Sequence, residues 1–478
     1  MAREMKDSGI EWIGEIPANW KVSLLKFSIR WKSEKGQPDA EVLSLYRDLG
    51  VVPKNSRDDN HNVTSLDTSG YKVVDIGDFV INKMKAWQGS MAVSKYAGIV
   101  SPAYHVCEIT NPDIYKEYFH HLLRNPAYIP EYLRLSTGMR TGQWDLGFDD
   151  FKNIPFIIPP YDEQIQIVKK IDRKCAEIDS VIADTQKTID EYKALKQSII
   201  TEAVTKGVRG ERKMKDSGVE WIGEVPEEWE VIPVKYVAEF QPSCDMSNLT
   251  DDSIITYLPM EHLKNGYYIQ NTAFYCSVAS SLTPFMNGDI VMAKVTPCFE
   301  NGNIAIMNDL SSGVGMGSSE LFVYRPLDVQ TKYLLYWLQN ILFKQAACAT
   351  MTGTGGLKRV SPYFAKHSKM TLPCYKEQLE IIRYLDEKCT SLDKLIESKQ
   401  QLLTELESYK KSVIYEYVTG KKECGIAVAQ VTQAAIVPFY PAAISTKRVR
   451  FAQAVLMTKV LDKCHKGMGR VKLEKTMY

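Results

Sequence analysis

The chain contains an internal duplication, and this feature limits its possible folds more than any other. Residues 5–20 read MKDSGIEWIGEIPANW, and residues 214–229 read MKDSGVEWIGEVPEEW. Twelve of these sixteen positions are identical at a shift of 209 residues, and two of the others exchange Ile for Val. The match predicts two copies of one domain rather than a single continuous core.

The duplication continues at slightly larger shifts. The segment GDFVINK at residues 77–83 is matched by GDIVMAK at residues 288–294, and Glu-Gln at 163–164 is matched at 377–378. Further matches lie in two expected helices: Tyr118, Leu123 and Asn125 correspond to Tyr333, Leu338 and Asn340. We therefore expect a shared framework with loops of different length, short strands around the GD-x-V segments, and mixed α/β or α+β globules.

Each copy is followed by a stretch in which near-apolar residues recur alternately three and four positions apart. This spacing is typical of a coiled-coil helix, and neither helix has a partner except the other. We predict two helices of about 40 residues, each about 60 Å long. The predicted helix–helix interface consists of Ile171, Ile178, Ile182, Ile189, Leu195, Leu385, Leu392, Ile396, Leu403 and Leu406.

The order of segments predicts how the two helices are oriented. A parallel pair would require the second globule to carry the chain back about 60 Å, which exceeds the size of a compact domain. We therefore predict an antiparallel coiled coil with a pseudo-two-fold axis and one globule near each end. The expected domains are 1–160, 213–373 (the two globules), 161–212 (first helix and linker), 374–421 (second helix) and 422–478 (a C-terminal extension).

Composition restricts the class of protein further. The chain has 478 residues, of which 45% are hydrophobic, and we find no run of about 20 apolar residues that would span a bilayer. We expect no secretory signal at the N-terminus, because no apolar run follows its charges. The ten cysteines form no C-x-x-C motif, so we expect neither a metal site nor disulfides, and a cytoplasmic location.

In these features the chain resembles the specificity subunits of Type I restriction–modification systems. The resemblance rests on the paired EWIGEIPANW and EWIGEVPEEW openings, the two GD-x-V segments, and the two P-x-Y-x-EQ segments that lead into the long helices. It covers about residues 1–421. The order of these motifs, duplicated around variable interiors, is more specific than any one of them.

The resemblance implies a function for each part. Each globule is expected to be a target recognition domain that reads one half of a bipartite, asymmetric site in double-stranded DNA. The helices are expected to set the spacing and to dock two modification subunits, which methylate adenine with S-adenosylmethionine. Restriction subunits that use ATP and Mg²⁺ for translocation and cleavage complete the expected assembly. The specificity subunit itself has no active site and binds no cofactor.

The residues agree with a non-catalytic chain. The segment IPPY at residues 158–161 lacks the Asn or Asp that begins the N/D-P-P-Y/F motif of amino-methyltransferases, so we interpret it as an extended exit into the first helix. No G-x-G-x-x-G or G-x-x-x-x-G-K-[ST] loop is present in the sequence. We predict no catalytic, cofactor-binding or metal-binding residues.

The charge balance is unusual for a DNA-binding protein. The net charge of the whole chain is +1, and the two globules carry net charges of −1 and −4. Neutralised phosphates supply most non-specific affinity for DNA. We therefore predict weak, salt-sensitive DNA binding by the isolated chain, with partner subunits sharing the grip on the phosphates.

Candidate DNA contacts lie in polar loops where the two copies diverge. Arg and Lys can pair with guanine, and Gln with adenine, in the major groove. Lys83 and Lys294 match between the copies, which favours contact with phosphates over reading of bases. The predicted DNA-binding residues are Lys83, Lys85, Gln88, Arg140, Thr141, Gln143, Lys294, Thr296, Lys358, Arg359 and Ser361.

Other features are given different interpretations. Trp12, Trp20, Trp221 and Trp229 recur with Ile, Val and Pro, so we expect them to brace each globule against a helix end and not to stack on bases. Residues 422–478 carry a net charge of +7, which modestly favours contact with nucleic acid, although a docking arm or a truncated domain remain alternatives.

Two other functional classes remain open. A stand-alone DNA methyltransferase or nuclease would act without partners, and activity of the purified chain with S-adenosylmethionine would reveal it. A coiled-coil scaffold with duplicated protein-binding domains would not bind DNA. Co-purification of methyltransferase subunits separates this scaffold from a specificity subunit.

Overall fold

The computed structural model describes residues 3–56, 67–138, 144–278, 281–354 and 356–424, and these residues form one compact unit. Arg140, Thr141, Gln143 and the extension beyond residue 424 lie outside the described residues. The unit contains two α+β globules of the same design and two long helices, as the sequence predicted. None of the described helices combines the length and the apolar character needed to cross a membrane.

Each globule is built on a four-stranded antiparallel sheet with the same strand order in both copies. In the first globule the order is β4 (Ile29–Lys32), β11 (Tyr104–Ile109), β8 (Phe79–Asn82) and β9 (Met91–Val93). In the second it is β18 (Ala238–Phe240), β25 (Leu321–Pro326), β22 (Ile290–Ala293) and β23 (Ile304–Ile306). The strands predicted at the GD-x-V segments are β8 and β22, which lie inside these sheets.

Three antiparallel strand pairs also occur in both globules. In the first they are β1 (Met5–Asp7) with β2 (Glu15–Pro17), β3 (Lys21–Leu24) with β14 (Pro155–Ile158), and β12 (Ser136–Thr137) with β13 (Asp145–Leu146). In the second they are β15 (Met214–Asp216) with β16 (Glu224–Pro226), β17 (Glu230–Pro233) with β28 (Lys369–Leu372), and β26 (Thr352–Thr354) with β27 (Leu357–Arg359).

The remaining strands differ between the copies. The first globule has the pairs β5 (Leu43–Tyr46) with β6 (Gly50–Pro53) and β7 (Lys72–Val74) with β10 (Gly98–Val100). The second has a further four-stranded sheet in the order β20 (Thr272–Phe274), β19 (Ile254–Leu258), β24 (Val314–Gly317) and β21 (Thr283–Met286). In this sheet β19 and β24 run parallel. Variable parts of this kind accompany the change in shift from 209 residues at Met5 to 215 at Tyr118.

Short helices complete the globules. The α-helices are α1 (Lys116–Leu123), α2 (Ile129–Leu135), α3 (Phe148–Phe151), α5 (Thr331–Gln339), α6 (Ile341–Ala349) and α7 (Pro362–His367). The 3₁₀ turns are η1 (Leu25–Phe27), η2 (Lys54–Ser56), η3 (Ala86–Gln88), η4 (Pro126–Tyr128), η5 (Val234–Tyr236), η6 (Met260–His262), η7 (Tyr275–Ser277) and η8 (Ser311–Gly313). The repeated Asn125 and Asn340 are helix N-caps, whose side chains accept hydrogen bonds from Ala127 N and Phe343 N.

The long helices are α4 (Tyr161–Lys206) and α8 (Tyr375–Val418), which contain 46 and 44 residues. Their lengths correspond to about 69 and 66 Å. The first turn contains Asp162 and Glu163 in α4 and Glu377 in α8, where the helix dipole favours negative charge. Pro160 precedes the first helical residue of α4, which confirms the interpretation of IPPY as an extended exit from the globule.

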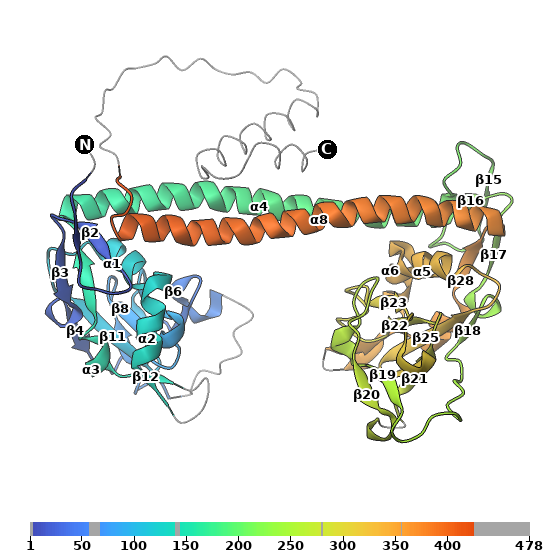
Figure 1. Cartoon of the computed structure of the whole chain (residues 1–478), viewed down its shortest axis with the longest axis horizontal. Helices are drawn as coiled ribbons and strands as arrows, with labels where there is room; N and C mark the ends of the chain where they lie inside the picture. Colours follow the sequence, from blue (N-terminus) through green and yellow to red (C-terminus); the bar gives the residue numbers. More distant parts are fainter. Residues whose placement is uncertain (1–2, 57–66, 139–143, 279–280, 355, 425–478) are drawn as a thin grey trace, which may run out of the picture. The chain divides into compact units, whose positions relative to one another are not determined.

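The two long helices lie side by side and antiparallel (Figure 1). Lys196 of α4 pairs with Asp393 of α8 at 2.7 Å, and Lys410 of α8 pairs with Asp179 of α4 at 2.6 Å. Residue numbers therefore rise on one helix while they fall on the other, as predicted. Residues 196 and 410, like 179 and 393, differ by the 214-residue shift, so a pseudo-two-fold axis relates the two ion pairs.

Each globule shares a core with one end of this helix pair. The core of the first globule contains Ile171 near the start of α4 and Val413 near the end of α8. The core of the second contains Ile200 near the end of α4 and Leu385 near the start of α8. The antiparallel pairing thus gives both globules the same kind of attachment.

Most of the predicted interface residues are at least partly buried, but the prediction for Leu195 is wrong. The buried ones are Ile171, Ile178, Ile189, Leu385 and Leu392, and the partly buried ones are Ile182, Ile396, Leu403 and Leu406. The Leu195 side chain is 47% exposed. Strict alternation of three and four residues leads from position 192 to position 196, so Lys196 occupies the seam and leaves Leu195 on the outside.

Candidate DNA interface

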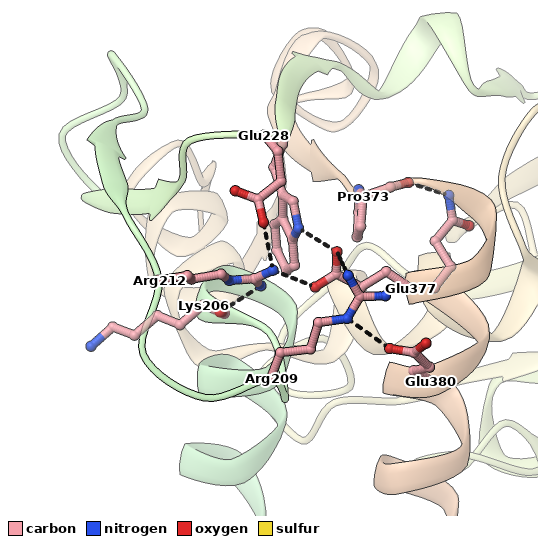
Figure 2. Close-up of polar contacts among 9 residues, drawn as sticks. Lys206, Arg209, Arg212, Glu228, Pro373, Glu377 and Glu380 are labelled. Atoms are coloured by element: carbon pink, nitrogen blue, oxygen red, sulfur yellow. Dashed lines mark hydrogen bonds and ion pairs between the residues drawn. The ribbon is translucent and has the colours of Figure 1, made fainter.

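The repeated Glu at the start of each long helix fixes that helix to its globule, and Figure 2 shows the second copy, Glu377. Glu377 is 1% exposed; it accepts hydrogen bonds from the Trp229 indole at 3.0 Å and from the Arg212 guanidinium at 2.7 Å. Arg209 adds a hydrogen bond to Glu380 at 2.8 Å, which raises the pKa of Arg209 and lowers that of Glu380. These contacts hold the linker, the second globule and α8 together.

The first copy has an equivalent but more open joint. Glu163 accepts hydrogen bonds from the Trp20 indole at 3.0 Å and from Arg3 at 2.6 Å. The Glu163 and Arg3 side chains are each 21% exposed. The sequence prediction that the repeated tryptophans brace the globules is supported by Trp20 and Trp229, both 1% exposed, although their carboxylate partners were not foreseen.

The Gln that follows each Glu serves the same framework. Gln164 accepts a hydrogen bond from Tyr115 N and donates to Pro159 O, at 2.8 and 2.9 Å. Gln378 likewise accepts from Gln330 N and donates to Pro373 O, both at 2.9 Å. The repeated Glu-Gln dipeptide is therefore a docking element between helix and globule, and it leaves other surfaces for recognition.

The aspartates of the GD-x-V segments are also structural. Asp78 is 5% exposed and accepts hydrogen bonds from Asp75 N at 2.8 Å and from Lys32 at 3.1 Å. Asp289 is 1% exposed; it accepts from Met286 N at 2.9 Å and pairs with Arg325 at 2.8 Å. Each carboxylate closes the turn before its strand, a role that the sequence alone did not reveal.

The segments that follow β8 and β22 are the first places where predicted DNA contacts gather. Leu146 N donates to Lys83 O in the first globule, and Val360 N donates to Lys294 O in the second. These equivalent hydrogen bonds join the loop after the central strand to the segment at β13 or β27. The structure therefore brings together the two predicted loop regions of the second copy. In the first copy it joins the loop after β8 to β13, and residues 139–143 before β13 lie outside the described residues.

In the first globule this region carries Lys83, Lys85 and Gln88. The Lys83 ammonium lies 2.7 Å from Asp145, and its side chain is 33% exposed. Lys85 is exposed and precedes η3, which ends at half-buried Gln88. Trp87 and Trp144 pack edge to face with ring centroids 5.2 Å apart, which further links this segment to the approach to β13.

In the second globule Lys294 and Thr296 follow β22. The Lys294 ammonium donates to Ser319 O at 2.7 Å. Thr296 is 8% exposed; its hydroxyl donates to Gly356 O and accepts from Lys358 N, at 2.8 and 2.9 Å. Thr296 thus shapes the β26–β27 hairpin, and its hydroxyl is already satisfied by the protein.

The hairpin and the turn after it hold the other predicted residues of the second globule. Lys358 is exposed, and Arg359 makes a two-pronged ion pair with Glu320, with its closest contacts at 2.8 Å. This pairing lowers the pKa of Glu320 and raises that of Arg359. Ser361 caps α7 by accepting a hydrogen bond from Phe364 N, so Lys358 and Arg359 are the side chains here with the best access to a ligand.

Reactive groups among the described residues do not form a catalytic arrangement that we can identify. Burial raises the pKa of the Cys107 thiol, and likewise those of the Tyr118 and Tyr333 hydroxyls, so none is activated at neutral pH. Within the described part of the chain, no group of three or more His, Cys, Asp or Glu side chains could hold a metal ion.

The architecture is that of a known class of two-globule proteins. A chain from a solved structure of a type I R-M system superposes with a TM-score of 0.62; the match covers 85% of this chain and 99% of that one at 14% identity. A likeness at this identity establishes the shared fold.

Sequence comparisons show which proteins the chain is similar to. Residues 40–202 match the model of the Type I restriction modification DNA specificity domain. The EcoAI specificity subunit of Escherichia coli is 34% identical over 195 residues, which are 40% of this chain and 32% of that subunit. The putative MjaX specificity subunit of Methanocaldococcus jannaschii is 23% identical over 444 residues, covering 86% of this chain and 95% of the relative.

These matches confirm the resemblance found in the sequence: the chain is a relative of the Type I restriction–modification specificity subunits. It spans about a third of the length of the EcoAI and EcoEI subunits that it matches.

Proposed function

We propose that the chain is the DNA sequence-specificity subunit of a Type I restriction–modification complex. Each globule reads one half of a bipartite, asymmetric DNA site. The antiparallel helices set the distance between the halves and dock modification subunits that methylate adenine. S-adenosylmethionine, ATP and Mg²⁺ are used by the partner subunits, and this chain contributes recognition without catalysis.

One observation carries this proposal: the same joint holds a globule at each end of a pseudo-symmetric helix pair. The Trp–Glu contact and the core shared with both helices recur in both copies. Because the attachments are equivalent, the divergent loops of the two globules point the same way relative to the helices. Two globules with different loops, attached in the same way to one helix pair, suit a DNA site whose two halves differ in sequence.

The helix geometry suggests the scale of the site. Ile171 and Ile200 of α4 belong to the cores of the first and second globules. At 1.5 Å per residue, these attachment points are about 44 Å apart. One turn of DNA is about 34–36 Å long, so the two globules would address half-sites separated by roughly one turn.

The proposal also accounts for the near-neutral charge. Globules with net charges of −1 and −4 offer little general attraction to phosphates. Recognition by this chain then depends on a few side chains that contact the DNA directly, and partner subunits supply most of the contacts with the phosphates. We therefore expect the isolated chain to bind DNA weakly and to bind tightly only with its modification subunits.

Mapping of methylated adenines in cells tests the proposal most directly. The chain is co-expressed with Type I modification subunits, and cells that express those subunits alone are the control. We expect adenine methylation at two short words separated by a fixed gap, and only when this chain is present. Methylation that is absent, or that occurs equally without the chain, would contradict the proposal.

The spacer role allows a sharper experiment. In an antiparallel pair the numbers of facing residues have a constant sum, and the pairs 196–393 and 179–410 both give 589. Residues 185–191 of α4 therefore lie opposite residues 398–404 of α8. Removing both segments deletes one heptad from each helix and preserves the seam. The helices shorten by about 10 Å, so we expect both words to be retained and the gap to shrink by about three base pairs. An unchanged gap would exclude the spacer role.

A further inference from the structure

The first globule exposes a large aromatic side chain that the tryptophan pattern does not explain. Trp31 lies on β4, an edge strand of the central sheet, and is 51% exposed. Its ring packs against Phe148 and His105, with centroids 5.4 and 6.0 Å away. It has no counterpart among the buried, repeated tryptophans, so bracing against a helix is not its role.

The position of Trp31 follows from the strand register. Trp31 pairs with Cys107, and His105 pairs with Ile81. Since residues two apart on a strand share a face, Trp31, Cys107, His105 and Ile81 lie on one face of the sheet. Cys107 and Ile81 belong to the buried core, whereas Trp31 lies where this face opens to solvent. Lys83 follows two residues beyond Ile81.

One lysine lies over this aromatic ring, and two further lysines lie near that lysine. The Lys72 ammonium lies 5.8 Å from the centroid of the Trp31 ring and donates to Tyr104 O at 2.5 Å. Lys35 is exposed, and its backbone bridges to Lys72. The pKa of Lys72 is lowered, first by burial and then by repulsion from Lys83 and Lys35. Three lysines therefore gather within a globule of net charge −1, and Asp145 offsets only Lys83.

In the second globule, two phenylalanines that pack on each other occupy the equivalent position. The strand register places Phe240 where Trp31 stands and Phe322 where His105 stands. Phe322 is 1% exposed, Phe240 packs on it at 5.1 Å, and Lys294 lies 5.6 Å from the Phe322 ring. The open aromatic and basic surface thus belongs to the first globule and is no part of the repeated framework.

We propose that Trp31, Lys35 and Lys83 form a DNA-contact patch, in which the two lysines take backbone phosphates and the Trp31 ring packs on sugar and base edges. Lys72, which is 8% exposed, adds positive charge beneath the ring without contacting the ligand. This inference rests on the proposed function. An exposed ring among cations matches a ligand that combines negative charge with flat apolar groups. A protein partner without acidic groups would gain nothing from the lysines.

Substitutions of exposed side chains test the patch in the full chain bound to its modification subunits. Affinity for the methylated duplex sequence is measured over a series of salt concentrations. Trp31→Ala should weaken binding about tenfold, while Trp31→Phe should retain most of the affinity. Lys35→Ala should weaken binding less and reduce the slope of log affinity against log salt by about one.

The same globule offers a matched control. Phe27 in η1 is 67% exposed, with the Lys26 ammonium 5.3 Å from its ring centroid. It resembles Trp31 in exposure and charge but lies outside the patch. Phe27→Ala should therefore leave affinity and salt slope unchanged, and methylation maps should show relaxed base choice for Trp31→Ala in one word only.

The outcomes separate the patch from the function. Sequence-selective binding by the wild type, with equal affinity for Trp31→Ala and an unchanged salt slope for Lys35→Ala, would overturn the patch and leave the function standing. An equal loss for Phe27→Ala and Trp31→Ala would also overturn it. A wild-type complex that discriminates no sequence would refute the function itself. If Trp31→Ala unfolds, the salt slope of Lys35→Ala still decides.

Discussion

The two globules are alike where they meet the helices and different where they face away from them. On the helix side, a Trp indole donates to a Glu carboxylate in both copies, at the same distance of 3.0 Å. On the other side, Asp145 of the first globule corresponds to Arg359 of the second, so the charge at this position is reversed. The two sides of one fold have thus followed different constraints.

This contrast has a physical cause. Both globules attach to the same antiparallel pair, and pseudo-two-fold symmetry presents each with an equivalent helix surface. Identical surfaces require identical partners, so the framework residues recur. Apart from the equivalent hydrogen bonds of Lys83 O and Lys294 O, we find nothing among the described residues that requires the loops after β8 and β22 to match. Their divergence is what a reader of an asymmetric site needs.

The largest expected difference between the halves concerns the two joints. Glu377 is almost fully buried between Arg212 and Trp229, whereas Glu163 is 21% exposed. Glu377→Ala leaves the buried Trp229 indole without its acceptor and leaves Arg212 with only Glu228 and Lys206 O, so it should lower the free energy of unfolding by about 2–4 kcal/mol. Glu163→Ala should cost about 1–2 kcal/mol, because water reaches its partners. Urea unfolding measures both losses, and equal values would contradict the assignment of a tighter second joint.

DNA recognition should also differ between the two globules, since Arg359 has no arginine counterpart in the first globule. Arg359→Ala should cost about 2 kcal/mol in binding the second word and leave the first word intact. Asp145→Ala, at the equivalent position, removes no donor and frees Lys83, so affinity should be unchanged or higher. Binding of duplexes with substitutions in one word at a time measures both effects. Loss at both words for Arg359→Ala would exclude its role in one half-site.

A smaller difference is expected at the tyrosines that reach the opposite helix end. The Tyr118 hydroxyl donates directly to Val418 O of α8 at 2.9 Å. In the second copy the Thr371 hydroxyl makes the equivalent bond, to Val204 O at 2.6 Å, and contacts Tyr333. Tyr118→Phe leaves a buried carbonyl without this donor and should cost about 1.5 kcal/mol. Tyr333→Phe should cost less than about 1 kcal/mol, and the reverse ranking in urea unfolding would contradict this account.

Features that depend only on local sequence patterns were predictable from the sequence. The spacing of apolar residues predicted α4 and α8, and connectivity predicted their antiparallel order. The strands at the GD-x-V segments and the helices that carry Tyr118 and Tyr333 were also expected, and the structure confirms them. Each of these inferences needs only the periodicity of a helix or strand, or the length of a connection.

Features that depend on distant partners were not predictable. Trp20 and Glu163 stand 143 residues apart, so their repetition indicated importance but not contact. The role proposed for Trp31 depends on lysines that are distant in the sequence and come near it only in the folded globule. Leu195 was misplaced because an apolar residue was preferred to the strict heptad position, which Lys196 fills with its aliphatic stem. The loop candidates Arg140, Thr141 and Gln143 remain predictions.

The smallest effects should come from the two ion pairs that cross between the helices. Lys196–Asp393 and Lys410–Asp179 are related by the pseudo-two-fold axis, and their aspartates are 56% and 54% exposed. Exposed pairs contribute little, so Asp393→Asn and Asp179→Asn should each cost at most about 0.5 kcal/mol, and equally. The loss of stability relative to the wild type should vanish at high salt for both variants. Unequal costs in urea unfolding would show that the helix pair is itself asymmetric, and the source of asymmetry would then extend beyond the loops.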